Sequence, residues 1–394
     1  MKNMFTKLPG GILLLLISLL FSPFSADANP STKQLHDMIQ AQQKQLDAMK
    51  AALKSAEASV KSAVTKADKT AKSGPELPKS FKFGGAMEIE AVQSENFAGV
   101  DSSDLTLGKL EAYFDAQPHE YVSTHFQLLY EDDGTETISL DEAYAIIGNT
   151  DEVPLYLQAG KWAVPFGGFD TAMSTDPLTK TLGETAEAAV MVGYSKDSLT
   201  IEGYGYNGDT QQSGDEDEID QFGLHVSFET EISGSTVSMG AGYISNITDS
   251  GTITENVTGG TALADYVPGW EVHGTFTNGP FVVYGGYMAA KDSFESGELA
   301  FNSQGAQPEA WNLEVAYVTE IMNKETIFAV TVQGSDEAVA LSLPETRYGG
   351  SMTVQVVPNY AATLEYLRDE DYSSSDGGTG ADGHTITAKL SAEF

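Results

Sequence analysis

The chain has 394 residues and a formal net charge of −36, with 57 acidic against 21 basic residues, which argues against nucleic acid as a partner. It contains no cysteine, which excludes disulfide scaffolds, thiolate metal sites and thiol nucleophiles. Residues 80–394 carry 51 of the acidic and 10 of the basic side chains, so the acidity belongs to the C-terminal part. We expect most of these carboxylates in solvated loops; a dedicated binding role is the alternative.

Residues 1–28 have the pattern of a secretory signal peptide. Lys2 and Lys7 precede an apolar run over residues 11–21, and Ala26-Asp-Ala28 ends the segment with small residues. This pattern predicts cleavage after Ala28, and the run is too short to span a bilayer as a helix. Because no later stretch reaches the ~18 apolar residues of a membrane helix, any further insertion must use strands.

Residues 29–72 predict a periplasmic coiled-coil helix. Ser31 and Gln34 form a capping box, and a seam with alternating spacings of four and three comes after it. The seam residues are Leu35, Ile39, Gln42, Leu46, Met49, Leu53, Ala56, Val60, Ala63 and Ala67. A lone amphipathic helix is the alternative, but so narrow a stripe favours self-association. Residues 73–80, with Gly74, Pro75 and Pro78, predict a linker.

From Phe81 onward the hydrophobic period is two, and Gly-rich and Asp-rich breaks separate short segments. The pattern predicts an antiparallel outer-membrane β-barrel over residues 81–394. Its sixteen strands lie near 81–93, 103–117, 119–131, 137–148, 154–164, 187–195, 197–207, 219–231, 234–247, 266–277, 280–291, 308–320, 324–334, 346–357, 359–369 and 383–394.

The connections between these strands alternate between short and long. Short ones include Gln117-Pro118, Lys196, residues 277–279 and Pro358. Since turns are short on the periplasmic side of such barrels, both barrel ends are expected in the periplasm, next to the stalk. The segments 137–148 and 280–291 show no clean alternation, and we expect bulges or subunit contacts there.

Individual strands favour a membrane barrel over a soluble sandwich. Phe222, Leu224, Val226 and Phe228 share one face of their strand, and Ile386, Ala388, Leu390, Ala392 and Phe394 share one face of the last. The terminal Phe394 resembles the recognition signal of the barrel-assembly machinery. That machinery, outer-membrane lipid and lipopolysaccharide are therefore expected partners.

A sixteen-stranded barrel leaves an aqueous channel unless something fills it. The candidate filler is the connection after the fifth strand, residues 164–186, which predicts an inward-folded constriction loop. An ordinary external loop is the alternative. The residues expected to shape the constriction are Phe166, Gly167, Asp170, Asp176, Lys180 and Glu184. The residues expected to face the lumen are Lys161, His225, Glu229, His273, Glu314 and Glu365.

No enzyme motif is present: the sequence lacks a Gly-x-Ser-x-Gly elbow, His-Glu-x-x-His and a phosphate loop. The six histidines are scattered, so we predict no metal site and no cofactor. The acidic stretch 215–220 lacks the spacing of an EF-hand. Such acidic loops could hold Ca²⁺ or Mg²⁺ only loosely, or bridge to lipopolysaccharide through divalent ions.

The order of parts resembles the LbtU-type siderophore porins, with a signal, a heptad helix, a linker and a barrel that ends in Phe. The densest match is residues 157–169, Leu-Gln-Ala-Gly-Lys-Trp-Ala-Val-Pro-Phe-Gly-Gly-Phe, together with 175–179 and 182–185. The resemblance implies a receptor or channel that admits ferric siderophores without the TonB energy system. Gly160-Lys161-x-x-x-Pro165-Phe166-Gly167 also resembles phosphate- and polyphosphate-type porins. Ten basic residues spread over the barrel, however, cannot make the ladder of an anion filter.

The sequence thus predicts a channel for a ferric siderophore or a similar small solute, in the outer membrane of a Gram-negative bacterium. A general or ion-selective porin, and a structural anchor between the outer membrane and the cell wall, are the alternatives. The heptads and the barrel size predict a homotrimer whose stalks join in the periplasm. The excess of carboxylates predicts a preference for cations.

Overall fold

The computed structural model describes residues 80–394, apart from 133–136, 215–217 and 259–261. The predicted signal peptide, the coiled-coil stalk and the linker up to residue 79 lie outside the described residues. The compact unit that contains the barrel is Pro78–Phe394. Among the described helices, none is long and apolar enough to cross a bilayer.

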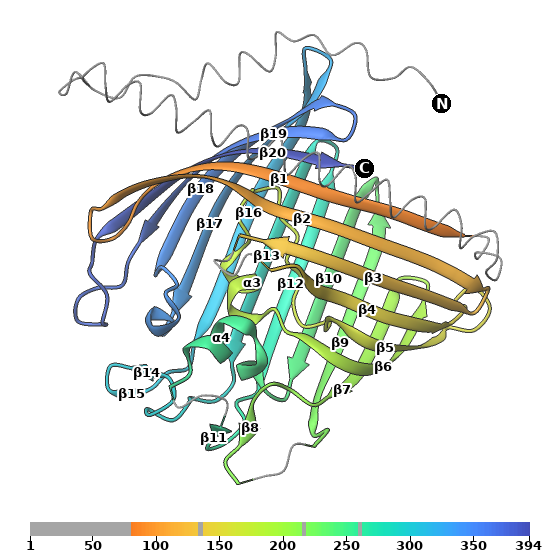
Figure 1. Cartoon of the computed structure of the whole chain (residues 1–394), viewed down its shortest axis with the longest axis horizontal. Helices are drawn as coiled ribbons and strands as arrows, with labels where there is room; N and C mark the ends of the chain where they lie inside the picture. The colour runs from red at the N-terminus through yellow and green to blue at the C-terminus, as the bar shows by residue number, and fades with distance from the viewer. Residues whose placement is uncertain (1–79, 133–136, 215–217, 259–261) are drawn as a thin grey trace. The chain divides into compact units, whose positions relative to one another are not determined.

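Sixteen strands of the described part form one closed antiparallel barrel, in which each strand pairs with the next and β20 pairs with β1 (Figure 1). All sixteen predicted strands are present, so this part of the fold prediction is confirmed. The barrel strands are β1 (Phe81–Glu95), β2 (Asp101–His119), β3 (Val122–Glu131), β4 (Ser139–Gly148), β5 (Leu155–Ala163), β6 (Ala186–Lys196), β7 (Leu199–Tyr206), β9 (Gln221–Ile232), β10 (Ser235–Ile244), β12 (Gly269–Asn278), β13 (Phe281–Ala290), β16 (Glu309–Ile321), β17 (Lys324–Asp336), β18 (Thr346–Val357), β19 (Tyr360–Glu370) and β20 (Asp382–Glu393).

The last residue of the chain closes the barrel. Phe394 and Gly85 of β1 exchange two backbone hydrogen bonds, both 3.0 Å long. The ring of Phe394 is 61% exposed and lies 6.3 Å from the ring of Phe83, centroid to centroid. The terminal aromatic therefore belongs to the outer surface and to the seam between β1 and β20.

Short turns and long loops alternate along the barrel, as the sequence predicts. Met322 and Asn323 form a two-residue turn with φ of 53° and 58°, the left-handed conformation that matches the twist of a hairpin. The turn between β2 and β3 lies later than predicted, because β2 continues through Gln117 and Pro118 to His119. The register between β2 and β3 shifts between Ala116 and His119, and proline, which cannot donate to a ladder, is tolerated at such an irregularity.

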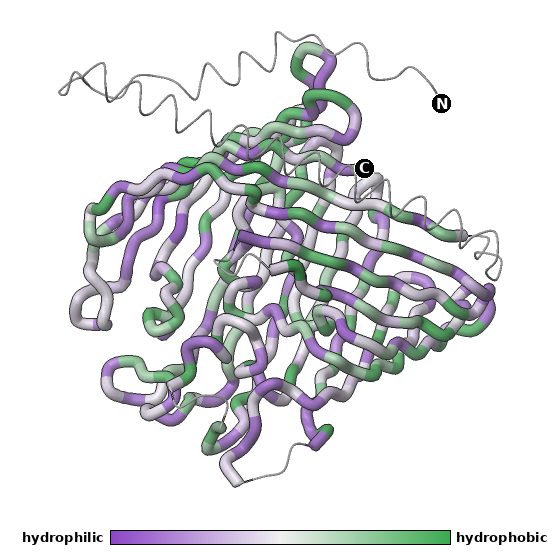
Figure 2. The backbone as a smooth tube through the Cα atoms, viewed as in Figure 1, coloured by the Kyte–Doolittle hydropathy of each residue, from purple (hydrophilic) through white to green (hydrophobic). Residues whose placement is uncertain are grey.

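Apolar side chains cover the outside of the barrel. Phe222, Leu224, Val226 and Phe228 of β9 are 40–54% exposed, while His225 in the same strand is buried. Figure 2 shows the same alternation of hydrophobic and hydrophilic residues along many strands. Exposed aliphatic and aromatic rows are what lipid requires of a spanning barrel.

One of the two irregular segments contains a bulge. Gln127 pairs with Glu142 and Leu128 with Leu140, so Asp141 is an extra residue in β4. The bulge predicted for residues 280–291 is absent, because β13 pairs without interruption with both β12 and β16. Gly285 and Gly286 blur the alternation of β13 without interrupting its ladder. A subunit contact at these segments stays a prediction.

The long loops carry structure of their own that the sequence did not predict. They contain α3 (Leu178–Gly183), η1 (Ile247–Asp249), α4 (Gly251–Asn256), η2 (Val339–Leu341) and the short strand pairs β8 (Gln211–Gln212) with β11 (Ala262–Leu263) and β14 (Ala300–Phe301) with β15 (Gln304–Gly305). Side chains of α3, η1 and α4 share one buried apolar cluster with strand residues such as Trp162, Ile244 and Met288. The apolar core therefore forms where loops pack into the barrel.

Candidate functional site

The connection between β5 and β6, residues 164–185, folds into the barrel, and we call it the constriction loop. Its hydrogen bonds to the wall reach β16, β17, β18 and β19, far away in the sequence. Glu314 of β16 accepts a bond of 2.6 Å from Thr171 Oγ1 and another of 2.6 Å from the backbone N–H of Ala172. The loop is thereby tied across the interior of the barrel.

Glu365 of β19 holds the next part of the loop. It accepts bonds of 2.5 Å from the Ser174 N–H and 2.5 Å from Thr175 Oγ1, and a longer one from the Thr175 N–H. Glu314 and Glu365 are only 2% and 1% exposed. Both lie inside the barrel, but they anchor the loop and do not line an open pore.

Helix α3 is the part of the loop that packs most deeply. Leu178 and Leu182 are buried in the apolar cluster. Pro177 occupies the N-cap position of the helix, where its side chain offers no hydrogen-bond acceptor. Instead, Gln333 of β17 accepts a 2.8 Å bond from the Leu178 N–H, so the barrel wall satisfies a free helix N–H group.

The root of the loop is apolar. Phe166 is buried in the same cluster as Trp162 and Leu178, so it holds the loop in place and does not border water. Gly167 has φ of +113°, a conformation that favours glycine, and a Cβ atom there would collide with the ring of Phe169. The predicted aromatic and glycine therefore set the path of the loop.

The charged side chains of the loop keep contact with water. On α3, Lys180 lies 2.9 Å from Asp176 and 3.7 Å from Glu184, one turn away on either side. These three residues line a cavity of about 160 Å³ with Gly251 and Thr252 of the neighbouring loop. Burial raises the pKa of Glu184, and the nearby Lys180 opposes that shift.

Asp170 is separate from this row of charges. It is exposed and lines a small cavity beside His273, Tyr284 and Asn312. Of the four charged residues predicted in the constriction, three are thus brought together in and beside α3, and the fourth lies against the β12–β16 wall.

Lys161 must be corrected, because the structure places it outside the predicted lumen row. It is exposed and alternates with Trp162 and Gln158, which are buried; Leu155 and Leu157 share its outer row. It pairs with Ala143 and Ala188, and its Nζ donates a 3.3 Å bond to the carbonyl of Leu140. A lysine on an outer face can keep its amine at the polar edge of a bilayer. The charge of Lys161 suggested the lumen, but its position in the alternation of β5 places it in the same row as Leu155 and Leu157.

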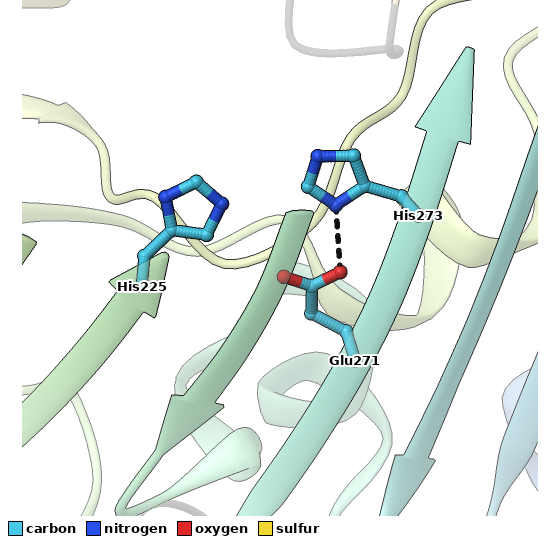
Figure 3. A group of neighbouring side chains, drawn as sticks. All are labelled: His225, Glu271 and His273. Atoms are coloured by element: carbon cyan, nitrogen blue, oxygen red, sulfur yellow. Dashed lines mark hydrogen bonds and ion pairs between the residues drawn. The ribbon is translucent and has the colours of Figure 1, made fainter. Parts of the chain in front are cut away.

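The three remaining lumen residues lie in inner rows. Glu229 is exposed near the turn after β9. His225 of β9 and His273 of β12 stack with ring centroids 5.7 Å apart and planes 6° apart. His273 Nδ1 lies 2.8 Å from Glu271 Oε2 (Figure 3). The sequence did not anticipate this pairing, although the alternation in β12 places Glu271 and His273 in one row.

The connection between β10 and β12 packs against the constriction loop through residues 245–258. Ser250 Oγ donates a 2.8 Å bond to the carbonyl of Leu182 in α3. Asp249 is buried and accepts bonds from Thr210 Oγ1 at 2.6 Å and from Asn246 Nδ2 at 3.1 Å. Burial raises the pKa of Asp249 to about 6. Sequence reasoning missed this buried carboxylate, because acidic loops are ordinarily solvated.

The wall formed by β1–β4, which we call the open wall, lies away from the hydrogen bonds of the loop. A cavity of about 320 Å³ opens along it, lined by polar side chains that include Lys82, Asp115, His125 and Tyr144. His125 Nδ1 lies 2.8 Å from Asp115. A water-accessible, charged strip therefore remains inside the barrel.

The chain is similar in sequence to curated proteins and similar in fold to solved structures, whereas no family model matches it. It is 28% identical over 329 residues to a UPF0422 protein of Coxiella burnetii, covering 81% of this chain and 70% of that one. It is 27% identical to a UPF0422 protein of Legionella pneumophila strain Philadelphia 1, covering 78% of this chain and 62% of the relative.

Among solved structures, the fold is similar to the outer membrane channel DcaP of Acinetobacter baumannii (TM-score 0.55, 12% identity, 81% of this chain and 99% of that one). It is also similar to an anion-selective porin from Comamonas acidovorans (TM-score 0.56, 12% identity, 80% and 99%). OmpF of Salmonella typhi gives a TM-score of 0.54 at 13% identity, with 80% and 97% covered. At such identities the likeness concerns the fold alone. The described part of this chain is a closed sixteen-stranded barrel with the fold of outer-membrane porins.

Proposed function

We propose that this protein is an outer-membrane porin of a Gram-negative bacterium, in which solutes pass between the constriction loop and the open wall. The observation that carries the proposal is the attachment of the loop to Glu314 and Glu365, which narrows the barrel without sealing the β1–β4 side. The apolar outer rows and the porin fold support a membrane location. We infer that the protein has no enzymatic activity.

The charge of the chain supports a preference for cations. Residues 80–394 carry 51 acidic and 10 basic side chains, and such an excess enriches cations near the channel mouth. The similarity to an anion-selective porin concerns the fold and carries no selectivity to this chain. The same excess of negative charge would favour Ca²⁺ or Mg²⁺ ions that are held loosely at the acidic loops or that bridge these loops to lipopolysaccharide.

For the solute we propose a ferric siderophore, admitted without the TonB energy system. The support is the resemblance of residues 157–169 to the LbtU-type siderophore porins. An anionic ferric complex would need a positive group at the constriction. Lys180 on α3 is the candidate, whereas Lys161 lies in an outer row.

We further propose that the chain assembles as a homotrimer with its stalks joined in the periplasm, and that the barrel-assembly machinery recognises Phe394. A trimer is known for OmpT of Vibrio cholerae, whose fold is similar at a TM-score of 0.51 and 12% identity. Deletion of residues 32–72 should weaken the trimer without preventing barrel insertion. Crosslinking in native membranes measures this, and capture of monomer alone from the full-length protein would contradict the assembly.

Single-channel recording in planar bilayers tests the proposal. The purified full-length protein should conduct, and removal of residues 167–181 should raise the conductance and loosen size exclusion. A protein that folds but does not conduct would indicate the anchor instead. Uptake of radiolabelled ferric siderophore by a deletion strain tests the solute separately, so a porin with a different solute is distinguishable from no porin at all.

A further inference from the structure

Three side chains converge on the inner wall of the barrel, from β9 and β12 (Figure 3). His225 comes from β9, and Glu271 and His273 come from β12. The strand between them, β10, places Gly240 opposite His273. A Cβ atom at Gly240 would collide with the ring of His273 and would lie 3.0 Å from Nε2 of His225. The glycine therefore leaves the space in which the two rings meet.

We propose that His225, Glu271 and His273 bind a divalent transition-metal ion, with Zn²⁺ as the representative ion. Each residue offers one ligand atom, and the three atoms lie within 4.8 Å of one another. Within the described ranges, this is the one group of side chains with such spacing. Two imidazoles and one carboxylate are a ligand set that zinc and its neighbours in the periodic table accept.

Two polar atoms of the group are buried without a hydrogen-bond partner in the part of the chain that the structure describes. They are Glu271 Oε1 and His225 Nε2, and Glu271 is 1% exposed. Burying a polar atom without a hydrogen-bond partner costs free energy, because its contact with water is lost and not replaced. This cost is larger for a charged group. A metal ion between the rings would satisfy both atoms, because each would donate a lone pair to it.

Neighbouring groups orient His225 for this role. Its Nδ1 lies 3.0 Å from Glu202 Oε2, and Tyr156 donates a 2.5 Å bond to the other oxygen of Glu202. Holding Nδ1 in this way leaves Nε2 as the free nitrogen. A carboxylate that holds the second nitrogen of a histidine is the usual outer partner of a metal ligand.

The geometry requires a small adjustment on binding. Ligands of a tetrahedral zinc ion lie roughly 3.3 Å apart, since each is about 2.0–2.1 Å from the metal. The three ligand atoms now lie up to 4.8 Å apart, so the side chains must draw closer together when the ion binds. A cavity of about 10 Å³ beside His273, which Asp170 and Gly168 of the constriction loop also line, has room for one water as a further ligand.

The ligand types decide which ions fit. Ca²⁺ and Mg²⁺ prefer sites made entirely of oxygen ligands, which this group does not supply. Imidazole nitrogens suit Zn²⁺, Cu²⁺, Ni²⁺ and Fe²⁺. The site therefore differs in kind from any loose binding of hard cations at the acidic loops, and competition with excess Mg²⁺ should leave it occupied.

Titration of the detergent-solubilised full-length protein with ZnCl₂ tests the site, after removal of metal by a chelator and in the presence of excess Mg²⁺. Isothermal calorimetry and elemental analysis should find one Zn²⁺ per chain. His225→Gln, Glu271→Gln and His273→Gln should each abolish that binding. His125→Gln is the matched control, because His125 is also an inner-wall histidine beside carboxylates. Heat-modifiable mobility on gels confirms that each variant is folded.

A second measurement uses the unaltered protein and does not depend on how variants fold. Co²⁺ bound to two histidines and a carboxylate at low coordination number should give an intense visible absorption band, which added Zn²⁺ removes. The weak spectrum of octahedral Co²⁺, an absence of Zn²⁺ uptake, or Zn²⁺ binding that survives in the His225→Gln/His273→Gln double variant would each overturn the proposal. None of these readouts depends on conductance, so the site and the porin function can fail separately.

Discussion

The two sides of the barrel interior use the same residue type in different ways. On the side of β16–β19, Glu314 and Glu365 are almost fully buried and accept hydrogen bonds from the constriction loop. On the open wall, Glu88 of β1 lies 3.2 Å from Lys389 of β20. Charged hydrogen bonds from fixed donors contribute roughly 1.5–3 kcal/mol each, whereas ion pairs near water contribute about 0–1 kcal/mol. The position of a glutamate in the barrel therefore decides whether it holds a loop or only carries charge.

The largest effect should come from the seam that closes the open wall. Phe394→Ser should strongly lower the yield of heat-modifiable barrel in the outer membrane, because the terminal aromatic is the proposed assembly signal. Phe83→Ser is a matched control, since it removes a neighbouring exposed ring from the same outer surface. Equal yields from both variants would show that only lost apolar surface matters.

Release of the constriction loop should be the next largest effect. The Glu314→Ala/Glu365→Ala double variant removes the acceptors of five hydrogen bonds from the loop. We expect single-channel conductance and current noise to rise several-fold, towards the values of the variant that lacks residues 167–181. Glu88→Ala removes a carboxylate from the open wall and should leave the conductance nearly unchanged. An equal response of the two walls would contradict the comparison.

Ion selectivity should change more modestly. The wild-type channel should prefer cations, most strongly at low ionic strength, because the Debye length is about 8 Å at physiological salt. Asp170→Asn should lower this preference more than Asp176→Asn, since Asp176 is already paired with Lys180 at 2.9 Å. Reversal potentials in a KCl gradient measure both. Anion preference in the wild-type protein would contradict the prediction that the excess of carboxylates selects cations, and would favour a phosphate-type porin.

The smallest effect should be a pH dependence of the loop that contains η1. Burial raises the pKa of Asp249 from 3.8 to about 6, so the folded loop holds its proton more tightly than an unfolded one. The stability of the loop should therefore fall by about 3 kcal/mol as pH rises from about 4 to 6 and stay level above that.

Hydrogen-exchange protection of residues 245–256, corrected for intrinsic rates, measures this change in stability. Asp249→Asn should abolish the dependence, because the amide does not titrate. Asp265→Asn, an exposed change in the same connection, should retain it. Protection that is independent of pH in the wild-type protein would contradict the prediction.

The hydrophobic period of the sequence was sufficient to locate the sixteen strands, the alternation of short and long connections, and the outer row that ends in Phe394. Each of these depends on neighbours along the chain, since alternate side chains of a strand point to opposite faces. The prediction was wrong at Lys161, where the charge of the residue was given more weight than its position in the alternation of the strand. It was also wrong at Gln117-Pro118, where a bulge keeps the proline within the strand.

Contacts that depend on pairing between strands could not be predicted from the sequence. His225 and His273 are 48 positions apart. They meet because the registers of the three strands place His225 opposite Gly242 of β10 and His273 opposite Gly240, the next inward-facing position of the same strand. In the same way, Glu314 and Glu365 became anchors only because a loop from β5 reaches them through the interior. Local periodicity determines which face a side chain occupies, whereas register and loop path, which depend on the closed barrel as a whole, decide what it meets there.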